Sequence, residues 1–202
     1  MSDSNAPEAR PYHHGDLRRA LVDAARQLLE TEGPAAMSLR AVARQAGVSP
    51  AAPYHHFKDK AELMVAIANE GWAVLSREMF EARGNNPHDP LASVMTYIGF
   101  ARARPALYRV MFDAARENET MLFGIKEDDG PYARFYDQLL EARRGSPDAD
   151  IELDVLAAWA SSHGLAEMAS FRQFGGLKEM LGGEEPFIRA VLERMGRHIQ
   201  LR

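Results

Sequence analysis

The chain has 202 residues, of which 46% are hydrophobic and 26% are charged, and these values are typical of a globular protein with a sizeable core. Its net charge of −5 excludes a surface that is basic throughout, and the absence of cysteine excludes disulfide frameworks and thiolate metal sites. No apolar run approaches the roughly 20 residues of a membrane-spanning helix, and the first residues lack a signal-peptide core. We therefore expect a cytoplasmic protein that does not enter membranes.

The chain begins with a polar arm followed by an amphipathic helix. Residues 1–14 contain Pro7 and Pro11 and are predicted to form a flexible arm. From Asp16 onward, apolar residues recur at three- and four-residue spacing, which predicts a helix. Gly33 and Pro34 are suitable signals for its end.

Two shorter helices are predicted next. Ser38 is a good N-cap for "LRAVARQAGV", and Gly47 is suited to the left-handed conformation that ends such a helix. A third helix is expected over 49–56, with Pro50 and Pro53 confined to its first turn, where proline costs least. A helix, a glycine turn and a short second helix form a helix-turn-helix, a layout that places its second helix in the major groove of DNA.

The rest of the chain also predicts helices. Asp59 and Glu62 resemble a capping box at the start of a long helix over 59–83. No alternating strand pattern of useful length occurs, so the expected fold class is all-α. We expect a helix-turn-helix DNA-binding domain over 15–60 and a larger ligand-binding and dimerisation bundle over 61–202. Further helices are predicted at about 90–103, 105–116, 131–144, 150–174 and 186–200.

The stretch "AARQLLETEGPAAMSLRAVARQAGVSPAAPYHHFKDKAELMVAI" resembles the tetracycline-repressor (TetR) family of transcriptional regulators. That family usually has a larger apolar residue where Pro53 stands. The departure resembles a subgroup with a WHG C-terminal domain, and Trp159, His163 and Gly164 in "AAWASSHGLAEM" are similar to the trio that names it. The resemblance implies a regulator, usually a repressor, that binds a palindromic DNA operator as a homodimer.

Contacts to DNA bases are expected from the helix over 49–56, whose first residues lie nearest the bases. Ala51, Ala52 and Pro53 offer only apolar contact, which suits thymine methyl groups. The groups left for hydrogen-bond contacts to bases are Ser49, Tyr54, His55 and Arg40.

Contacts to phosphates are implied by the family resemblance for Ser38, Tyr54 and Lys60. Such contacts fix the register and supply affinity that depends on salt. The segment 38–60 also has a local positive surplus, with four basic residues and one acidic residue. Two alternatives remain: Tyr54 packs at the end of its helix, and His55 contacts only solvent.

The C-terminal bundle predicts a small-molecule pocket. Residues 97–136 are rich in large apolar and aromatic side chains, and a bundle enclosing such groups with a few hydroxyls forms a natural apolar pocket. Ordinary core packing is the alternative for each of them. We expect a small apolar effector that releases the DNA. The candidate ligand-binding residues are Tyr97, Phe100, Tyr108, Met111, Phe112, Phe135, Trp159 and His163.

A dimer interface is expected on the helix over 150–174 together with the last helix. Small residues at three- and four-residue spacing allow another helix to approach closely. The resemblance implies pairing with a second copy, and intrachain packing is the alternative. The residues concerned are Ala157, Ala160, Ser161, Gly164, Met168, Phe187, Val191, Met195 and Ile199.

An enzyme or another small-molecule-binding module is the alternative function. Ser161, Ser162 and His163 are neighbours on one predicted helix, so their side chains point apart and do not form a nucleophile–base pair. There is no glycine-rich phosphate loop and no nucleophile elbow. We therefore expect neither catalysis nor a cofactor or metal.

Overall fold

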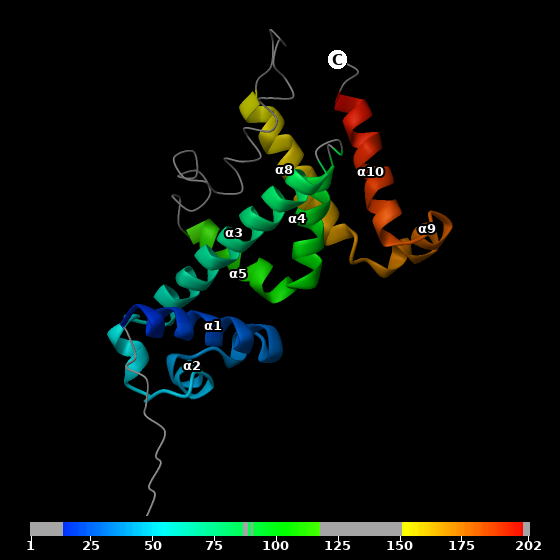
Figure 1. Cartoon of the computed structure of the whole chain (residues 1–202). Helices are drawn as coiled ribbons and strands as arrows, with labels where there is room; N and C mark the ends of the chain where they lie inside the picture. The colour runs from blue at the N-terminus through cyan, green and yellow to red at the C-terminus, as the bar shows by residue number, and fades with distance from the viewer. Residues whose placement is uncertain (1–13, 87–88, 90, 118–150, 200–202) are drawn as a thin grey trace, which may run out of the picture. The chain divides into compact units, whose positions relative to one another are not determined.

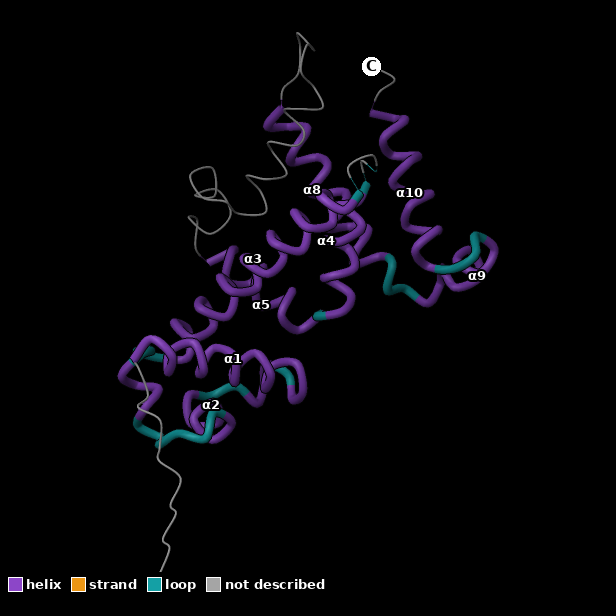
Figure 2. Tube along the Cα trace, in the orientation of Figure 1, coloured by secondary structure: helices purple, strands orange, loops and turns teal. Residues whose placement is uncertain are grey.

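The computed structural model describes residues 14–86, 89, 91–117 and 151–199. Every regular element in these ranges is a helix, and Figure 2 draws the described residues as helices and loops, which confirms the all-α fold class. The chain divides into two compact units, Met1–Ile67 (unit 1) and Ala68–Arg202 (unit 2). This division falls inside helix α3 (Lys60–Asn85), whereas the sequence places the domain boundary at its start.

Unit 1 begins with α1 (His14–Glu32) and α2 (Leu39–Gln45), which pack against each other and are blue in Figure 1. A short 3-10 helix, η1 (Pro34–Ala36), joins them. The side chain of Phe57 is only 1% exposed and belongs to the core of this unit. The buried residues of α1 and α2 follow the predicted helical spacing and are Leu21, Val22, Ala24, Ala25, Leu28, Leu29, Leu39, Ala41, Val42 and Ala43.

The predicted glycine stop signals are confirmed in both helices of unit 1. Gly33 and Gly47 have φ angles of 79° and 68°, a conformation that residues with a Cβ atom rarely adopt. After α2, the Val48 N–H donates to the Ala43 carbonyl at 3.0 Å, and the Gly47 N–H donates to the Arg44 carbonyl at 3.2 Å. These two bonds form a Schellman motif, so the turn begins at a defined residue.

The element after this turn differs from its prediction. The sequence predicts an α-helix over 49–56, whereas the structure has a turn followed by a 3-10 helix, η2 (Ala52–His55). Backbone N–H groups here bond carbonyls three residues earlier, as from Ala52 to Ser49 at 3.0 Å. Pro53 explains the difference, because it has no N–H to donate to the Ser49 carbonyl and its ring crowds an α-helical turn.

Helix α3 begins at the predicted capping signals. The Glu62 N–H donates to Asp59 Oδ1 at 2.9 Å, and the Lys58 N–H donates to Glu62 Oε2 at 2.7 Å. In a capping box the glutamate bonds the N–H of the capping residue itself, whereas Glu62 bonds the residue before it. The backbone N–H groups of Lys58 and Glu62 are both satisfied, so the start of α3 is well defined.

In its described residues, unit 2 contains the rest of α3 and four further long helices. These are α4 (Ala92–Ala103), α5 (Pro105–Glu117), α8 (Ile151–Met168) and α10 (Glu184–Ile199). Helix α4 packs against both α5 and α8. The largest fully buried side chains of this unit are Leu75, Ile98, Phe100, Leu107 and Met111.

The chain after α8 differs from prediction. The sequence predicts one helix over 150–174, but α8 ends at Met168 and is followed by a 3-10 helix, η4 (Arg172–Phe174). A six-residue helix, α9 (Gly175–Met180), then occupies the stretch that was expected to be a break. The helix predicted at 131–144 lies outside the described residues.

Gly175 and Gly176 are the first two residues of α9, whereas Gly182 and Gly183 lie between α9 and α10. Gly182 and Gly183 have φ angles of 88° and 124° and separate α9 from α10. Lys178 donates to the Ala169 carbonyl at 2.5 Å, which satisfies a backbone group just after α8 ends. Phe187 was predicted to lie on the dimer face. Its side chain is only 4% exposed, because it packs within the chain, where its ring lies 5.9 Å from that of Phe174.

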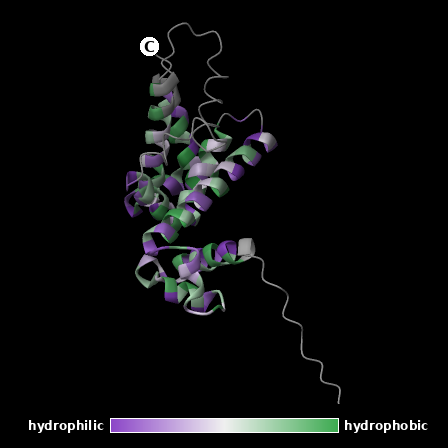
Figure 3. Ribbon diagram, turned by 90° about the vertical axis from the view of Figure 1, so that its left-hand side faces the viewer, coloured by the Kyte–Doolittle hydropathy of each residue, from purple (hydrophilic) through white to green (hydrophobic). Residues whose placement is uncertain are grey.

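Hydrophobic and hydrophilic residues share most of the helices, as the mixed colours of Figure 3 show. This pattern is typical of amphipathic helices that bury one face. Among the described residues, no helix is both long enough and apolar enough to cross a membrane.

Candidate nucleic-acid interface and small-molecule cavity

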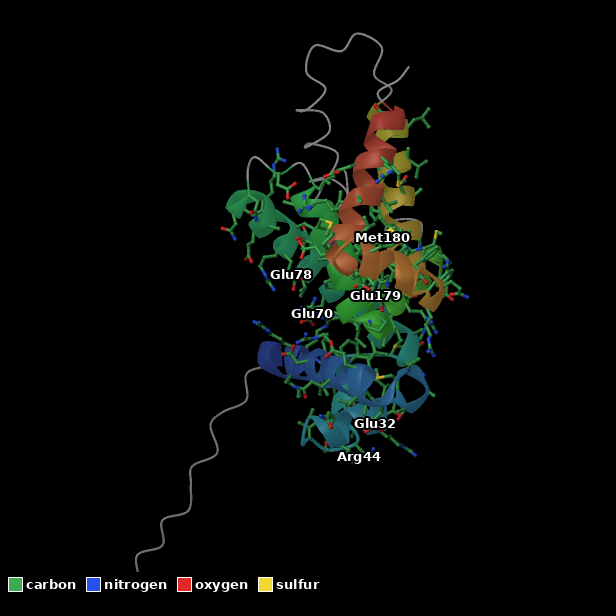
Figure 4. The ribbon with its side chains drawn as sticks, turned by 90° about the vertical axis from the view of Figure 1, so that its right-hand side faces the viewer. Glu32, Arg44, Glu70, Glu78, Glu179 and Met180 are labelled. Atoms are coloured by element: carbon green, nitrogen blue, oxygen red, sulfur yellow. The ribbon has the colours of Figure 1, made fainter. Side chains whose placement is uncertain are left out.

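The first half of the helix-turn-helix presents polar and basic side chains from α2. Ser38 caps this helix, and its Oγ accepts a hydrogen bond from the Ala41 N–H at 3.1 Å. The Ser38 hydroxyl therefore keeps its own proton for another acceptor. Arg40 and Arg44 follow on α2, and both are exposed, with Arg44 at the surface in Figure 4.

The second half presents small and aromatic side chains around η2. Ser49, Ala51 and His55 are exposed, and the side chain of Tyr54 is 53% exposed. Tyr54 therefore lies near the end of η2 with its side chain partly covered, and its contact to a phosphate stays a prediction. Ala52 is half-buried.

Pro53 is buried and faces the interior of its own unit. The expectation that it contacts thymine methyl groups is therefore wrong. The 3-10 geometry rotates its ring inward, so the apolar surface that this segment offers to DNA consists of Ala51 and part of Ala52.

The side chains that follow η2 anchor the helix-turn-helix to the core of unit 1. Phe57 is buried, and the guanidinium of Arg18 lies 5.1 Å from the centre of its ring, in a cation–π contact. Lys60 is exposed on the first turn of α3, and its ammonium donates to the Pro34 carbonyl at 3.3 Å. An ammonium has two further protons, so this bond orients Lys60 and leaves donors for a phosphate.

Exposed cations outnumber exposed anions on the segment 38–60. Its only acidic residue is Asp59, whose carboxylate accepts from the α3 backbone, and its basic residues all lie at the surface. A phosphate backbone is attracted to such a surface, and this attraction weakens as salt rises. The exposed basic residues are Arg40, Arg44, Lys58 and Lys60.

Unit 2 contains a cavity of about 740 Å³ between α4, α5 and α8, a size that suits a small organic molecule. Tyr108, Phe112 and His163, all predicted as ligand-binding residues, line it. Five further residues of its wall are charged, so the cavity is more polar than the sequence predicts. Among the described residues, the lining consists of Ala101, Arg102, Pro105, Tyr108, Arg109, Phe112, Asp113, Arg116, His163, Ala166, Glu167 and Ser170.

The other predicted ligand-binding residues do not line this cavity. Tyr97, Phe100 and Met111 are at most 5% exposed and pack in the core of unit 2. Trp159 lies behind the cavity wall, where its indole nitrogen donates to the Tyr97 hydroxyl at 3.2 Å. Phe135 lies outside the described residues.

A chain of hydrogen bonds connects the core to the cavity wall. Tyr97 and Tyr108 hydroxyls lie 2.6 Å apart, and the Tyr108 hydroxyl lies 2.5 Å from His163 Nδ1. An indole nitrogen can only donate, so Trp159 donates to Tyr97. Every group is then satisfied if Tyr97 donates to Tyr108 and Tyr108 donates to His163 Nδ1. In the reverse direction the buried Tyr97 proton would have no acceptor among these groups.

Burial shifts the pKa of each titratable member of this chain toward its neutral form. It raises the pKa of Tyr97 to about 12 and raises the pKa of Tyr108 further. Burial also lowers the pKa of His163, and this effect outweighs the nearby Glu167 carboxylate, which acts in the opposite direction. A neutral imidazole agrees with Nδ1 acting as an acceptor.

Helix α3 reaches the back of the cavity wall through Trp72, which the sequence analysis did not single out as a functional residue. The Trp72 ring lies 5.2 Å from Phe112 and 6.0 Å from Trp159, measured between ring centres and in edge-to-face geometry. Next to it, a Cβ atom on Gly71 would lie 2.6 Å from the sulfur of the buried Met111. Helices α3 and α5 therefore meet at close range behind Phe112.

The charged residues of the cavity wall were also missed by sequence analysis. Arg109, Phe112, Asp113 and Arg116 are spaced by three, four and seven residues on α5, which places them on one helical face. That spacing was visible in the sequence. Arg102, however, comes from α4, and only the packed structure shows that it belongs to the same wall.

The fold and the two sites define the class of protein. A helix-turn-helix presents exposed cations in one unit, and a separate helical unit encloses a cavity suited to a small molecule. This is the organisation of a DNA-binding transcription regulator.

Comparison with known families identifies which kind. Residues 21–67 match the family described as bacterial regulatory proteins, tetR family, and residues 91–195 match the tetracyclin repressor-like C-terminal domain. The chain belongs to the TetR family of DNA-binding transcription regulators. The WHG subgroup stays a prediction. Its three residues lie on α8, where Trp159 and His163 take part in the hydrogen-bond chain.

Solved structures agree with this assignment. A protein of unknown function from Rhodococcus sp. RHA1 is 30% identical, with a TM-score of 0.72, over 94% of this chain and 98% of that one. A tetR-family regulatory protein from Rhodococcus RHA1 is 21% identical, with a TM-score of 0.60, over 88% and 93% of the two chains. A TetR-family regulator from Marinobacter aquaeolei VT8 is 19% identical, with a TM-score of 0.54, over 78% and 87%.

Proposed function

We propose that this regulator is a homodimeric repressor that binds a palindromic operator and is released from it by a small molecule bound in unit 2. The observation that carries the proposal is the cavity of about 740 Å³, whose wall includes Phe112. Phe112 contacts Trp72 of α3, and the first residues of α3 belong to unit 1. A ligand that displaces Phe112 would move α3 and thereby the helix-turn-helix.

Two helix-turn-helix units, one per subunit, would contact half-sites about 34–36 Å apart or a multiple of that distance. The coupling between effector and DNA would be about 1–3 kcal/mol and would be the same in both directions. Base contacts are assigned to Arg40, Ser49, Ala51, Ala52, Tyr54 and His55, and phosphate contacts to Ser38, Tyr54 and Lys60. Each of these side chains is exposed or half-buried in the free chain.

The dimer interface is assigned to the exposed face of α8. Ala157 and Ala160 are exposed, and Leu156 is 52% exposed. Val191 and Met195 of α10 are half-buried and complete the proposed face. Light scattering coupled to gel filtration is expected to give a dimer, and Ala160→Arg is expected to give a monomer. Ala73→Arg, at an exposed position of α3, is the matched control.

We assign no catalytic activity to unit 2. The Ser162 hydroxyl donates to the Ala158 carbonyl at 2.7 Å, and His163 Nδ1 faces Tyr108, so the two do not form a nucleophile–base pair. We also propose a cytoplasmic location, because a DNA-binding regulator would act where the DNA is.

A mobility shift with the DNA upstream of the gene tests the DNA-binding surface. The logarithm of the affinity is expected to fall linearly with the logarithm of the salt concentration. Lys60→Ala should weaken binding to all sequences and reduce that slope by about 1, since it removes one phosphate contact. Arg77→Ala, at an exposed position in unit 2, is the control. Binding that ignores salt, or that survives Tyr54→Ala combined with Lys60→Ala, would contradict this surface.

A further inference from the structure

The cavity of unit 2 has one aromatic wall. The rings of Tyr108, Phe112 and His163 all line it, and each lies within 6 Å of the other two. The closest pair is Phe112 and His163, with ring centres 4.5 Å apart, and Tyr108 is nearly parallel to His163, at 24°. Rings arranged in this way offer flat faces and edges to a planar partner.

The wall also has positively charged side chains, and among the described residues its arginines come from α4 and α5. Arg116 is paired with Asp113 at 2.7 Å, and Arg102 is paired with Glu184 at 2.7 Å. Arg109 is exposed, and no ion pair joins it to any other described residue. Arg102 also has a second guanidinium nitrogen, Nη1, that is buried without a hydrogen-bond partner among the described residues. The wall therefore has donors in excess on this side.

Acceptors on the described part of the wall are fewer than donors. Asp113 lies on α5 with Arg109 and Arg116 but is paired with Arg116, and Glu167 comes from α8. The cavity is therefore locally positive in a chain whose net charge is −5. A carboxylate on Arg116 and on Arg102 offsets their charges, whereas Arg109 has no ion-pair partner among the described residues and is left to attract an anion.

The hydrogen-bond chain determines which nitrogen of His163 carries the proton. Because Tyr108 donates to Nδ1, the neutral ring of His163 carries its proton on Nε2. His163 lines the cavity, so its ring offers an N–H donor beside the aromatic faces. This donor suits an acceptor on the ligand, such as a ring oxygen, a carbonyl or a carboxylate.

We propose that the cavity of unit 2 binds a planar aromatic carboxylate, with its ring system against Tyr108, Phe112 and His163 and its carboxylate on Arg109. Arginine pairs with carboxylates through two parallel N–H···O bonds, which fixes the ligand in direction as well as in charge. The inference rests on the proposed function only in treating the ligand as the effector. It differs from the expectation of an apolar effector, which came from the aromatic residues alone.

Isothermal titration of the whole protein with four probes tests the ligand class. The probes are 2-naphthoate, its neutral amide, 2-(aminomethyl)naphthalene and decanoate. 2-Naphthoate is expected to bind at least about tenfold more tightly than each of the others, since only it combines a planar ring with a charge-assisted acceptor. Equal or tighter binding of the amide or the amine would overturn the carboxylate, and equal or tighter binding of decanoate would overturn the planar ring. Failure of 2-naphthoate to bind would also overturn the proposal.

Two variants locate the binding. Arg109→Gln removes the charge and the fork of donors, and it is expected to weaken 2-naphthoate about tenfold while leaving the amide unchanged. Arg77→Gln makes the same change at an exposed position that does not line the cavity, and it is expected to bind like the wild type. If both variants bind alike, the carboxylate does not lie on Arg109.

The same probes separate this inference from the proposed function. Titration measures binding to the free protein, and a mobility shift with saturating 2-naphthoate measures release from DNA. Binding without release would contradict the proposed effector response and leave the ligand class in place. Release by the amide but not by the carboxylate would support the proposed effector response and contradict the ligand class.

Discussion

Units 1 and 2 place their functional side chains differently with respect to their cores. In unit 1, Tyr54 is exposed, while Phe57, on the next turn of the chain, is buried in the core. In unit 2, Tyr108 and His163 line the cavity and also belong to the buried hydrogen-bond chain. Under the proposed function, stability and binding are therefore carried by different residues in unit 1 and by the same residues in unit 2. A surface that meets an external partner can change residue by residue, but a cavity wall cannot.

The chain offers a readout for each side of this comparison. Both of its tryptophans, Trp72 and Trp159, lie in unit 2 and contact each other. Tryptophan fluorescence therefore reports on unit 2, whereas far-UV circular dichroism follows the helices of both units. Unfolding that the two probes report at different urea concentrations would mean that the units unfold separately.

The largest expected effect tests the separation in unit 1. Phe57→Ala should lower the free energy of unfolding by about 3–5 kcal/mol, because it leaves a cavity where a buried ring also contacts Arg18. Tyr54→Ala should change it by less than about 0.5 kcal/mol, since an exposed side chain is lost. Urea unfolding followed by circular dichroism measures both, and a mobility shift measures DNA binding. Similar stability losses in the two variants would break the comparison.

Because the same residues of unit 2 serve stability and ligand binding, one substitution there should reduce both. Tyr108→Phe removes the hydroxyl that joins Tyr97 to His163, so it should cost about 1–3 kcal/mol of unfolding free energy and also weaken ligand binding in the cavity. Tyr54→Phe removes the same atom from an exposed residue and should leave stability unchanged. Tryptophan fluorescence during urea unfolding and titration with 2-naphthoate are the measurements. A Tyr108→Phe protein that loses only one of the two properties would show that they are separable here as well.

A pair of glycine variants sharpens the account of how closely the helices of unit 2 pack. Gly99→Ala, at an exposed position with open space around it, should stabilise the protein by about 1 kcal/mol through helix propensity. Gly71→Ala gains the same propensity but places a methyl group against Met111, and overpacking costs about 1–3 kcal/mol. We expect the two variants to differ by that overpacking cost in thermal unfolding. Equal stabilities would mean that Met111 moves aside freely.

Local signals were enough to predict unit 1. The Ser38 cap, the Gly47 stop and the Asp59 start each act within four residues, so the sequence places the elements correctly. The exception is Pro53, whose missing N–H converts an expected α-helix into a 3-10 turn and buries its own ring. The placement of both prolines in the first turn predicted that residues 49–56 form a helix, but it did not predict that this helix would be of the 3-10 type.

Unit 2 was predicted only in outline. The sequence predicts its helices, but its cavity combines residues from α4, α5 and α8, and no local pattern connects Arg102 to Arg109 or His163. Composition favoured an apolar pocket because buried and lining aromatics look alike in sequence. Tyr97 and Phe100 are in fact core, and the arginines that change the character of the cavity look like ordinary solvated charges.

The smallest expected effect is a pH dependence that belongs to unit 2. Burial holds the pKa of His163 below its ordinary value of 6.5, against Glu167 on its own helix and with Arg116 of α5 acting in the same direction as burial. As the pH falls below 6.5, the unfolded chain binds a proton at this position before the folded chain does. The free energy of unfolding should therefore decrease with falling pH in that window, and the contribution should be complete above it.

His163→Gln isolates this contribution from those of the other histidines. The glutamine side chain does not titrate and can still accept a hydrogen bond from Tyr108, so the variant should lose part of the stability slope below pH 6.5 while unfolding cooperatively. His55→Gln, at an exposed position of unit 1, shows the effect of replacing a histidine as such. Tryptophan fluorescence during urea unfolding between pH 5 and 8 gives the slopes. If His163→Gln and the wild type keep parallel profiles, the ring is not held neutral by the hydrogen-bond chain, and its Nε2 proton can no longer be assigned to the cavity.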